Sequence, residues 1–162
     1  MPSGKTHDRV NIVSTAILGY FAYSRGMGLD EVVAFCLGSL VATFWFSPDL
    51  DLSYSKPVKR WGRLSFIWRP YSLIVPHRGI SHVPVLGILT RFGYIFVIFL
   101  FFWFLIAGTL YNLGLSPPQL KPLSIFKNPY FIPFLLGILF ADTLHIVLDW
   151  VWSSLKRGVK VR

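Results

Sequence analysis

The longest apolar stretch of the chain runs from Val83 to Leu115 and contains a single charged residue, Arg91. A membrane-spanning helix needs about 20 consecutive, predominantly apolar residues, so this stretch is long enough to cross a bilayer. The composition agrees, because 14% of the residues are charged, against roughly 25% in an ordinary soluble domain. We therefore predict an integral membrane protein. The apolar content also argues against a nucleic-acid-binding domain, although the net charge is +9.

The sequence predicts an all-α fold, an integral membrane four-helix bundle that forms a single domain over residues 1–162. The predicted spans lie at about residues 10–24, 31–47, 83–113 and 130–154. The first span is short and follows Lys5 and Arg9, so a signal peptide is the alternative there. No small-residue cleavage site follows it, and we interpret it as a helix that pairs with the second span.

A basic segment, residues 49–82, separates the second and third predicted spans. It carries aromatic side chains such as Trp61, Phe66 and Trp68 among its lysines and arginines. Amphipathic rings beside cations suit a segment that lies at the level of the lipid headgroups. We predict an interfacial loop with anionic lipid headgroups as partners, and a plain solvated loop is the alternative.

The positions of the cations predict the orientation of the four spans. Twelve of the sixteen Lys and Arg residues fall in the N-terminal segment, the 49–82 loop and the C-terminal tail, and three fall on the other side. Lys and Arg are enriched in cytoplasmic segments of membrane proteins. Both termini and the basic loop are therefore predicted to be cytoplasmic.

All four histidines and five of the seven acidic residues fall into four short motifs. These are Thr6-His7-Asp8, Pro48-Asp49-Leu50-Asp51, His77-Arg78-Gly79-Ile80-Ser81-His82 and the segment Asp142 to Asp149, which includes His145. In the predicted topology every motif lies toward the cytoplasmic side. On a helix, Asp142, His145 and Asp149 share one face. Carboxylates in a membrane helix are costly unless they are paired, so we expect a bound metal ion, and hydrogen bonds to Arg91 and the backbone are the alternative.

The four motifs, in this order, resemble the prokaryotic membrane-bound metal-dependent hydrolases of the YdjM type. The opening residues PSGKTHDR resemble a related group of uncharacterised membrane proteins described as metal-binding. Both groups are distantly similar to the zinc-dependent phospholipase C and single-strand-specific zinc nuclease superfamily. The resemblance implies a multi-pass protein of the prokaryotic inner membrane, with metal ligands at His7, Asp49, Asp51, His77, His82, His145 and Asp149. Unlike the soluble superfamily, the chain has few HxxxD/E elements, which puts a three-metal cluster in doubt.

Helical spacing adds Asp142 to these candidate ligands. Their number exceeds the four that one zinc ion normally takes, so two divalent ions are expected. Zinc is favoured by the mixed imidazole and carboxylate donors, and manganese or iron are alternatives. Arg78 is a candidate phosphate clamp, and either Asp8 or Asp142 is a candidate general base.

These expectations lead to two hypotheses about function. The first is a metal-dependent hydrolase, in which a metal-activated water attacks a phosphoester. Its substrate would be an amphiphile with an anionic head, such as a phospholipid or a polyprenyl phosphate. The alternative is a non-catalytic metal-binding membrane protein.

Overall fold

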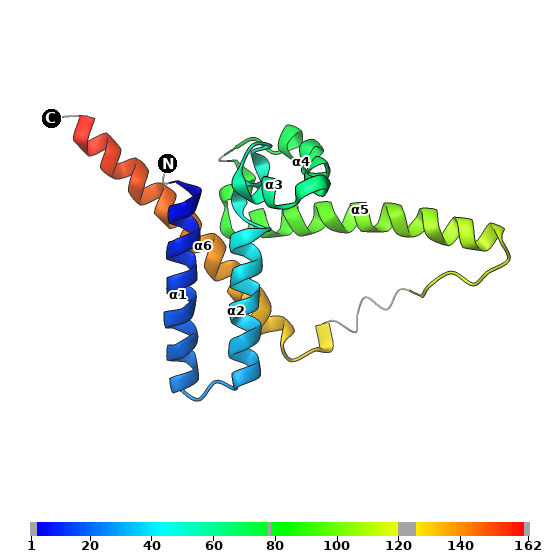
Figure 1. Ribbon diagram of the computed structural model, residues 1–162, viewed down its shortest axis with the longest axis horizontal. Coiled ribbons are helices and arrows are strands. Elements are labelled where there is room, and N and C mark those ends of the chain that lie inside the picture. The colour runs from blue at the N-terminus through cyan, green and yellow to red at the C-terminus, as the bar shows by residue number, and fades with distance from the viewer. Residues whose placement is uncertain (1–2, 78, 120–125, 161–162) are drawn as a thin grey trace.

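The computed structural model describes residues 3–77, 79–119 and 126–160. Within these residues the fold is all-α, as predicted, and contains no strand (Figure 1). The long helices are α1 (Gly4–Ser24), α2 (Leu29–Phe44), α5 (Pro84–Asn112) and α6 (Phe131–Lys160). The short elements are η1 (Pro48–Asp51), α3 (Lys56–Arg60), η2 (Gly62–Ile67), α4 (Trp68–Ile74) and η3 (Ile80–His82).

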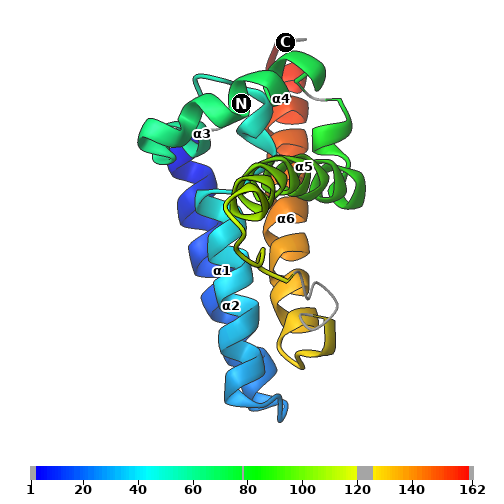
Figure 2. The ribbon, with the colours of Figure 1, turned by 90° about the vertical axis from the view of Figure 1, so that its right-hand side faces the viewer.

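Helices α1, α2 and α6 pack together, with α1 and α2 antiparallel (Figures 1 and 2). The backbones of α2 and α6 approach closely at two glycines. A Cβ atom on Gly38 would lie 2.0 Å from the carbonyl oxygen of Phe134, and one on Gly137 would lie 2.0 Å from that of Phe35. Small residues at such positions let membrane helices pack backbone to backbone. These two glycines therefore set the distance between α2 and α6.

The buried face of α1 is polar or small at every fourth residue. His7, Asn11, Thr15 and Gly19 form this face. Thr15 Oγ1 lies 2.6 Å from Ser39 Oγ on α2, and Asn11 Nδ2 donates to a backbone carbonyl of α6. The opposite face exposes large apolar side chains such as Ile17. Helix α1 therefore turns its polar side toward its neighbours and its apolar side outward.

Helix α5 does not join the three packed helices, which corrects the predicted four-helix bundle. It contacts the rest of the described structure near its first turns and then runs outward (Figures 1 and 2). Gly87, Arg91 and Ala107 are its buried residues. A helix that is apolar on all sides has no single face that protein packing favours. The sequence pattern could therefore predict this helix but not its direction.

The short elements between α2 and α5 enclose a small core of their own. It is built from Leu50, Val58, Trp68 and Tyr71, all buried. Tyr71 Oη lies 3.2 Å from Thr90 Oγ1 on α5. Burial raises the pKa of this phenol, although the contact with Thr90 opposes the rise, so the hydroxyl keeps its proton. This core holds η1 and the start of α5 together.

Three helical regions in the described part of the chain are long and apolar enough to cross a membrane. They cover Leu29–Asp51, Pro84–Asn112 and Phe131–Arg157. The first predicted span lies within α1, which is not among the three. Its content of apolar residues is lowered by polar side chains such as Asn11 and Thr15, which face the neighbouring helices.

Candidate metal centre

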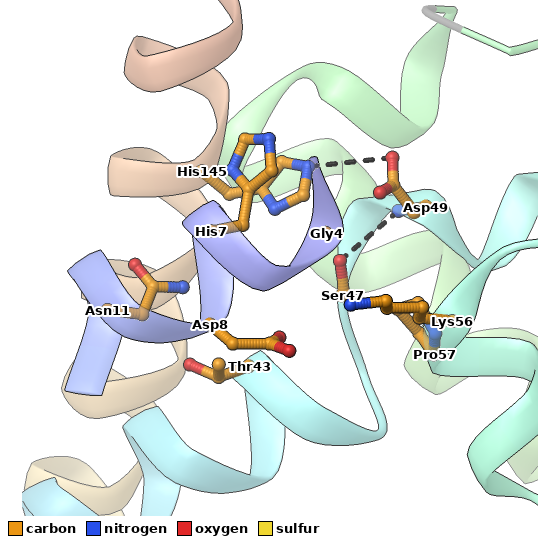
Figure 3. Close-up of a pocket in the computed structure, with 10 residues that line it drawn as sticks. All are labelled: Gly4, His7, Asp8, Asn11, Thr43, Ser47, Asp49, Lys56, Pro57 and His145. Atoms are coloured by element: carbon orange, nitrogen blue, oxygen red, sulfur yellow. Dashed lines mark hydrogen bonds and ion pairs between the residues drawn. The ribbon is translucent and has the colours of Figure 1, made fainter. Parts of the chain in front are cut away.

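Motifs that are far apart in the sequence meet at one end of the packed helices. His7 lies near the start of α1, Asp49 in η1, and His82 at the end of η3. His145 and Asp149 lie one turn apart in α6. Figure 3 shows His7, Asp49 and His145 side by side, although they come from three different elements. The structure therefore brings all four sequence motifs into one region.

Four side chains present donor atoms toward a common point. We call Asp49, His82, His145 and Asp149 the four-donor group. Asp49 Oδ1 lies 3.5 Å from His145 Nε2 and 3.8 Å from His82 Nε2. Asp149 Oδ2 lies 3.8 Å from His145 Nε2 and 4.0 Å from His82 Nε2. All four atoms lie within 4.8 Å of one another.

The same four atoms are buried and lack a hydrogen-bond partner among the described residues. An unpaired buried polar atom is costly, and buried polar atoms in proteins are nearly always paired. A tetrahedral zinc ion with bonds of about 2.0–2.2 Å separates its ligands by roughly 3.3–3.6 Å. The four nitrogen–oxygen separations of 3.5–4.0 Å lie within or slightly above this range. Two imidazole nitrogens and two carboxylate oxygens therefore fit a divalent ion of the zinc type in chemistry and in spacing.

Local sequence explains how Asp49 and His82 reach this point. Pro48 follows the end of α2 and begins η1, and Ser47 Oγ accepts a hydrogen bond from the Asp49 backbone N–H. Pro84 begins α5 directly after the turn that holds His82. Proline ends or starts helices because it has a fixed φ angle and no N–H donor. Both donors therefore lie where proline imposes a tight turn at a helix end.

The hydrogen-bond network assigns the tautomer of His82. The single proton of the Ser81 hydroxyl is donated to the Asp51 carboxylate, which can only accept. The Ser81 oxygen lies 3.0 Å from His82 Nδ1, so Nδ1 carries the proton and donates to it. The Nε2 atom then has the free lone pair and faces two carboxylates. This arrangement is repulsive unless a cation lies between them, and it matches the usual support of a metal-binding histidine.

A second group consists of Asp51, His77 and His82, and it shares His82 with the first. His77 Nδ1 lies 2.9 Å from Asp51 Oδ1, and Ser81 is completely buried against the other oxygen. A neutral imidazole has one free lone pair. His82 can therefore serve only one of the two groups at a time while it stays neutral. In the observed network Asp51 supports His82 through Ser81.

His7 lies beside the four-donor group. Its ring stacks on the ring of His145 with 4.0 Å between centroids. His7 Nε2 lies 3.3 Å from Asp149 Oδ1, the oxygen that the four-donor group does not use. His7 is therefore placed to orient Asp149 and to cover His145.

Two of the predicted site residues, Asp8 and Asp142, lie outside the four-donor group. Asp8 faces Arg60 through two hydrogen bonds, the shorter of 2.6 Å. Asp142 is buried and forms an ion pair with Arg91. Each candidate general base is thus held by a guanidinium. Arg78, the candidate phosphate clamp, lies outside the described residues.

A cavity of about 10 Å³ adjoins the four-donor group (Figure 3). Its walls include His7, Asp8, Asn11, Lys56 and other residues shown in the figure. This volume is about the minimum that a single water molecule needs. A cavity of this volume does not by itself enclose a phosphoester group.

Sequence analysis missed Ser81 as part of the site. The available signal was its position directly before His82 in the motif, where a hydroxyl can bond the adjacent imidazole. Its partner Asp51 lies 30 residues away, so the complete contact required the fold.

Comparison with known proteins places the chain in a family. Residues 2–159 match the family described as "Uncharacterized metal-binding protein (DUF2227)". The chain belongs to this family. An "Uncharacterized protein" of Aquifex aeolicus (strain VF5) is 44% identical over 135 residues, which is 79% of this chain and 96% of the relative. No solved structure matches the chain.

The family match confirms the prediction of a metal-binding protein. It agrees with the donor chemistry of the four-donor group. It gives no support to the resemblance to hydrolases of the YdjM type or to the phospholipase C superfamily. Hydrolysis therefore has no support beyond the motifs themselves.

Proposed function

We propose that the four-donor group holds one divalent metal ion, with zinc the first candidate, and that the protein is a non-catalytic metal-binding membrane protein. One observation carries this proposal: the four atoms that point at each other are buried and have no hydrogen-bond partner in the described part of the chain. Bound there, the ion would neutralise two carboxylates and link η1, η3 and α6. Manganese and iron also accept such mixed donors.

The surroundings of the group favour binding without catalysis. Structural zinc sites have four protein ligands, whereas catalytic sites have three and keep one position open for water. The four donors already complete a tetrahedral set, and the adjoining cavity admits about one water molecule. Asp8, which lines this cavity, and Asp142 are each paired with an arginine. The small cavity and these two ion pairs therefore favour metal binding over hydrolysis.

The distribution of side chains supports a membrane location. Polar groups such as Asn11, Thr15 and Ser39 are buried, while many large apolar side chains are exposed. Extensive exposed apolar surface suits contact with lipid or with a partner. Polar contacts between helices are a usual form of association in membranes. We propose that the apolar helices α2, α5 and α6 contact the lipid of a prokaryotic inner membrane.

The basic segment supports an interfacial position for α3, η2 and α4. Residues 52–81 contain no Asp or Glu. Arg63 and Arg69 are exposed there beside the exposed apolar side chains of Phe66 and Leu73. Cations near a membrane surface attract anionic lipids with about 1 kcal/mol each. Anionic headgroups on the cytoplasmic side are the proposed lipid partners.

Elemental analysis of the detergent-purified protein tests the metal site. We expect about one equivalent of metal in the parent and loss of it in the Asp49→Asn and His145→Ala variants. Asp30→Asn is the matched control, because Asp30 is an exposed acid at the other end of α2. A parent that stays metal-free after reconstitution with zinc, manganese or iron would refute the site.

Two further outcomes would correct the proposal in part. Two equivalents of metal, both lost in Asp49→Asn, would show a two-ion site that includes Asp51 and His77. Turnover of phospholipid or polyprenyl phosphate by the metal-loaded parent, absent in Asp49→Asn, would overturn the non-catalytic assignment.

A further inference from the structure

Arg91 is a buried cation at which three segments of the chain meet. Its side chain is 1% exposed. Nη1 donates to the carbonyl oxygen of Phe46 at 2.7 Å, and Nε donates to that of Gly87 at 2.9 Å. Nη2 donates to the carboxylate of Asp142. The guanidinium thus bonds to the segment that links α2 to η1, to its own helix α5, and to α6.

Each of these three contacts lies close to a metal donor in the sequence. Phe46 is three residues before Asp49, and Asp142 is three residues before His145. Gly87 lies in the first turns of α5, just after the turn that holds His82. The described hydrogen bonds include no other side chain that bonds to all three donor-bearing segments.

We propose that Arg91 is a positioning residue of the metal centre, which sets the spacing of its donors without contacting the ion. This inference rests on the proposed function. The planar guanidinium presents several donors in a fixed fork, whereas a lysine ammonium is a compact charge on a flexible stem. One Arg91 side chain can therefore fix the directions of the Phe46 and Asp142 contacts together.

Arg91 and the metal ion would compensate the charges of different carboxylates. The four-donor group has two carboxylates, which a divalent ion neutralises, and Arg91 neutralises Asp142. A buried pair can be replaced by uncharged groups with little loss of stability, whereas removal of one partner is strongly destabilising. Removal of both charges together should therefore preserve the fold while releasing the Phe46 carbonyl.

The experiment measures Co²⁺ binding by visible absorption in detergent, with Zn²⁺ competition for affinity. The variants are Arg91→Lys, which keeps the charge, and the double variant Arg91→Met with Asp142→Asn, which removes both charges. We expect both to bind about 10- to 100-fold more weakly, the usual effect of losing a group that supports metal ligands. A change in the Co²⁺ absorption bands should accompany the loss, because the donor geometry changes.

Arg60→Lys is the matched control, since Arg60 also forms an ion pair but outside the four-donor group. It should bind Co²⁺ like the parent. Parent-like affinity and bands in both Arg91 variants would overturn the inference. For a variant that melts early, the rise of Tm with Zn²⁺ is measured instead, and a rise equal to the parent's would overturn it.

Failure of both variants to fold even with Zn²⁺ would also overturn the inference, because Arg91 would then be a determinant of folding. A parent that binds no Co²⁺ would refute the proposed function before any variant is compared. The two failures are thus distinguishable.

Discussion

Replacement of Gly137 by alanine tests whether the contact between α2 and α6 determines the metal site. The new Cβ atom would lie 2.0 Å from the Phe35 carbonyl oxygen and 2.8 Å from the Ser39 backbone nitrogen. Real Cβ contacts essentially never fall below 3.0 Å. Backbone atoms cannot rotate away as a side chain can. The two helices must therefore separate by about 1 Å, the shortfall that the contact with Phe35 imposes.

Two opposing terms give the size of the effect on stability. Overpacking of this kind costs about 1–3 kcal/mol, and a rigid backbone contact places it at the upper end. Alanine in place of glycine in a helix returns about 1 kcal/mol through its better helix propensity. The net loss in unfolding free energy is about 2 kcal/mol, which lowers Tm by roughly 4–8 °C for a chain of this size.

The same separation should weaken metal binding. Gly137, Ala141, His145 and Asp149 follow at intervals of four residues on one face of α6. Moving this face away from η1 would stretch the 3.5 Å separation between His145 and Asp49. Functional groups must be held within about 0.5 Å of their working geometry, so we expect at least tenfold weaker Co²⁺ binding.

Thermal unfolding of the apo protein in detergent and Co²⁺ titration measure the two effects. Gly93→Ala is the control, because a Cβ there meets no atom within 4 Å. The control should melt at or slightly above the parent temperature and bind Co²⁺ normally. If Gly137→Ala matches the parent in both measurements, or if Gly93→Ala loses as much stability, the reasoning from backbone contact is refuted.

Three other predictions concern the centre and its surroundings. Ser81→Ala should reduce metal affinity about 10- to 100-fold, because the proton of His82 would no longer be held on Nδ1. The control Ser72→Ala should keep the parent affinity. Equal affinities of the two variants, measured by Zn²⁺ competition, would contradict this prediction. Removing the metal with a chelator should lower Tm, since an ion present at a hundred times its Kd contributes about 2.7 kcal/mol to stability. If the metal-loaded parent melts at the same temperature before and after the chelator is added, no ion is bound. Changing Arg63 and Arg69 to Gln should reduce the anionic lipid retained in native mass spectrometry, and identical retention would remove the case for an interfacial basic segment.

Much of the local structure could be predicted because it depends on neighbours in the sequence. The all-α fold follows from apolar stretches of helical length, and the helix ends follow from Pro48 and Pro84. The grouping of histidines and acids into four motifs suggested a shared site. Helical spacing placed His145 and Asp149 on one face, where the structure has them one turn apart.

Contacts between distant residues could not be predicted in the same way. Asp8 and Asp142 have the same chemistry as the aspartates of the four-donor group, yet Arg60 and Arg91 pair with them. These partners lie 52 and 51 residues away in the sequence. Which carboxylate receives an arginine depends on which helices are adjacent, and spacing along the chain does not specify that.

By itself, the sequence determined that the chain forms apolar helices and that its histidines and most of its acidic residues fall in four short motifs, because hydropathy, helical period and motif spacing are local properties. The tertiary structure decided which donors remain without partners. It also decided that α5 leaves the packed helices, since a helix apolar on every side has no preferred face. The backbone contact at Gly38 and Gly137 brings α2 against α6, and the donors of the candidate metal centre come from η1, η3 and α6.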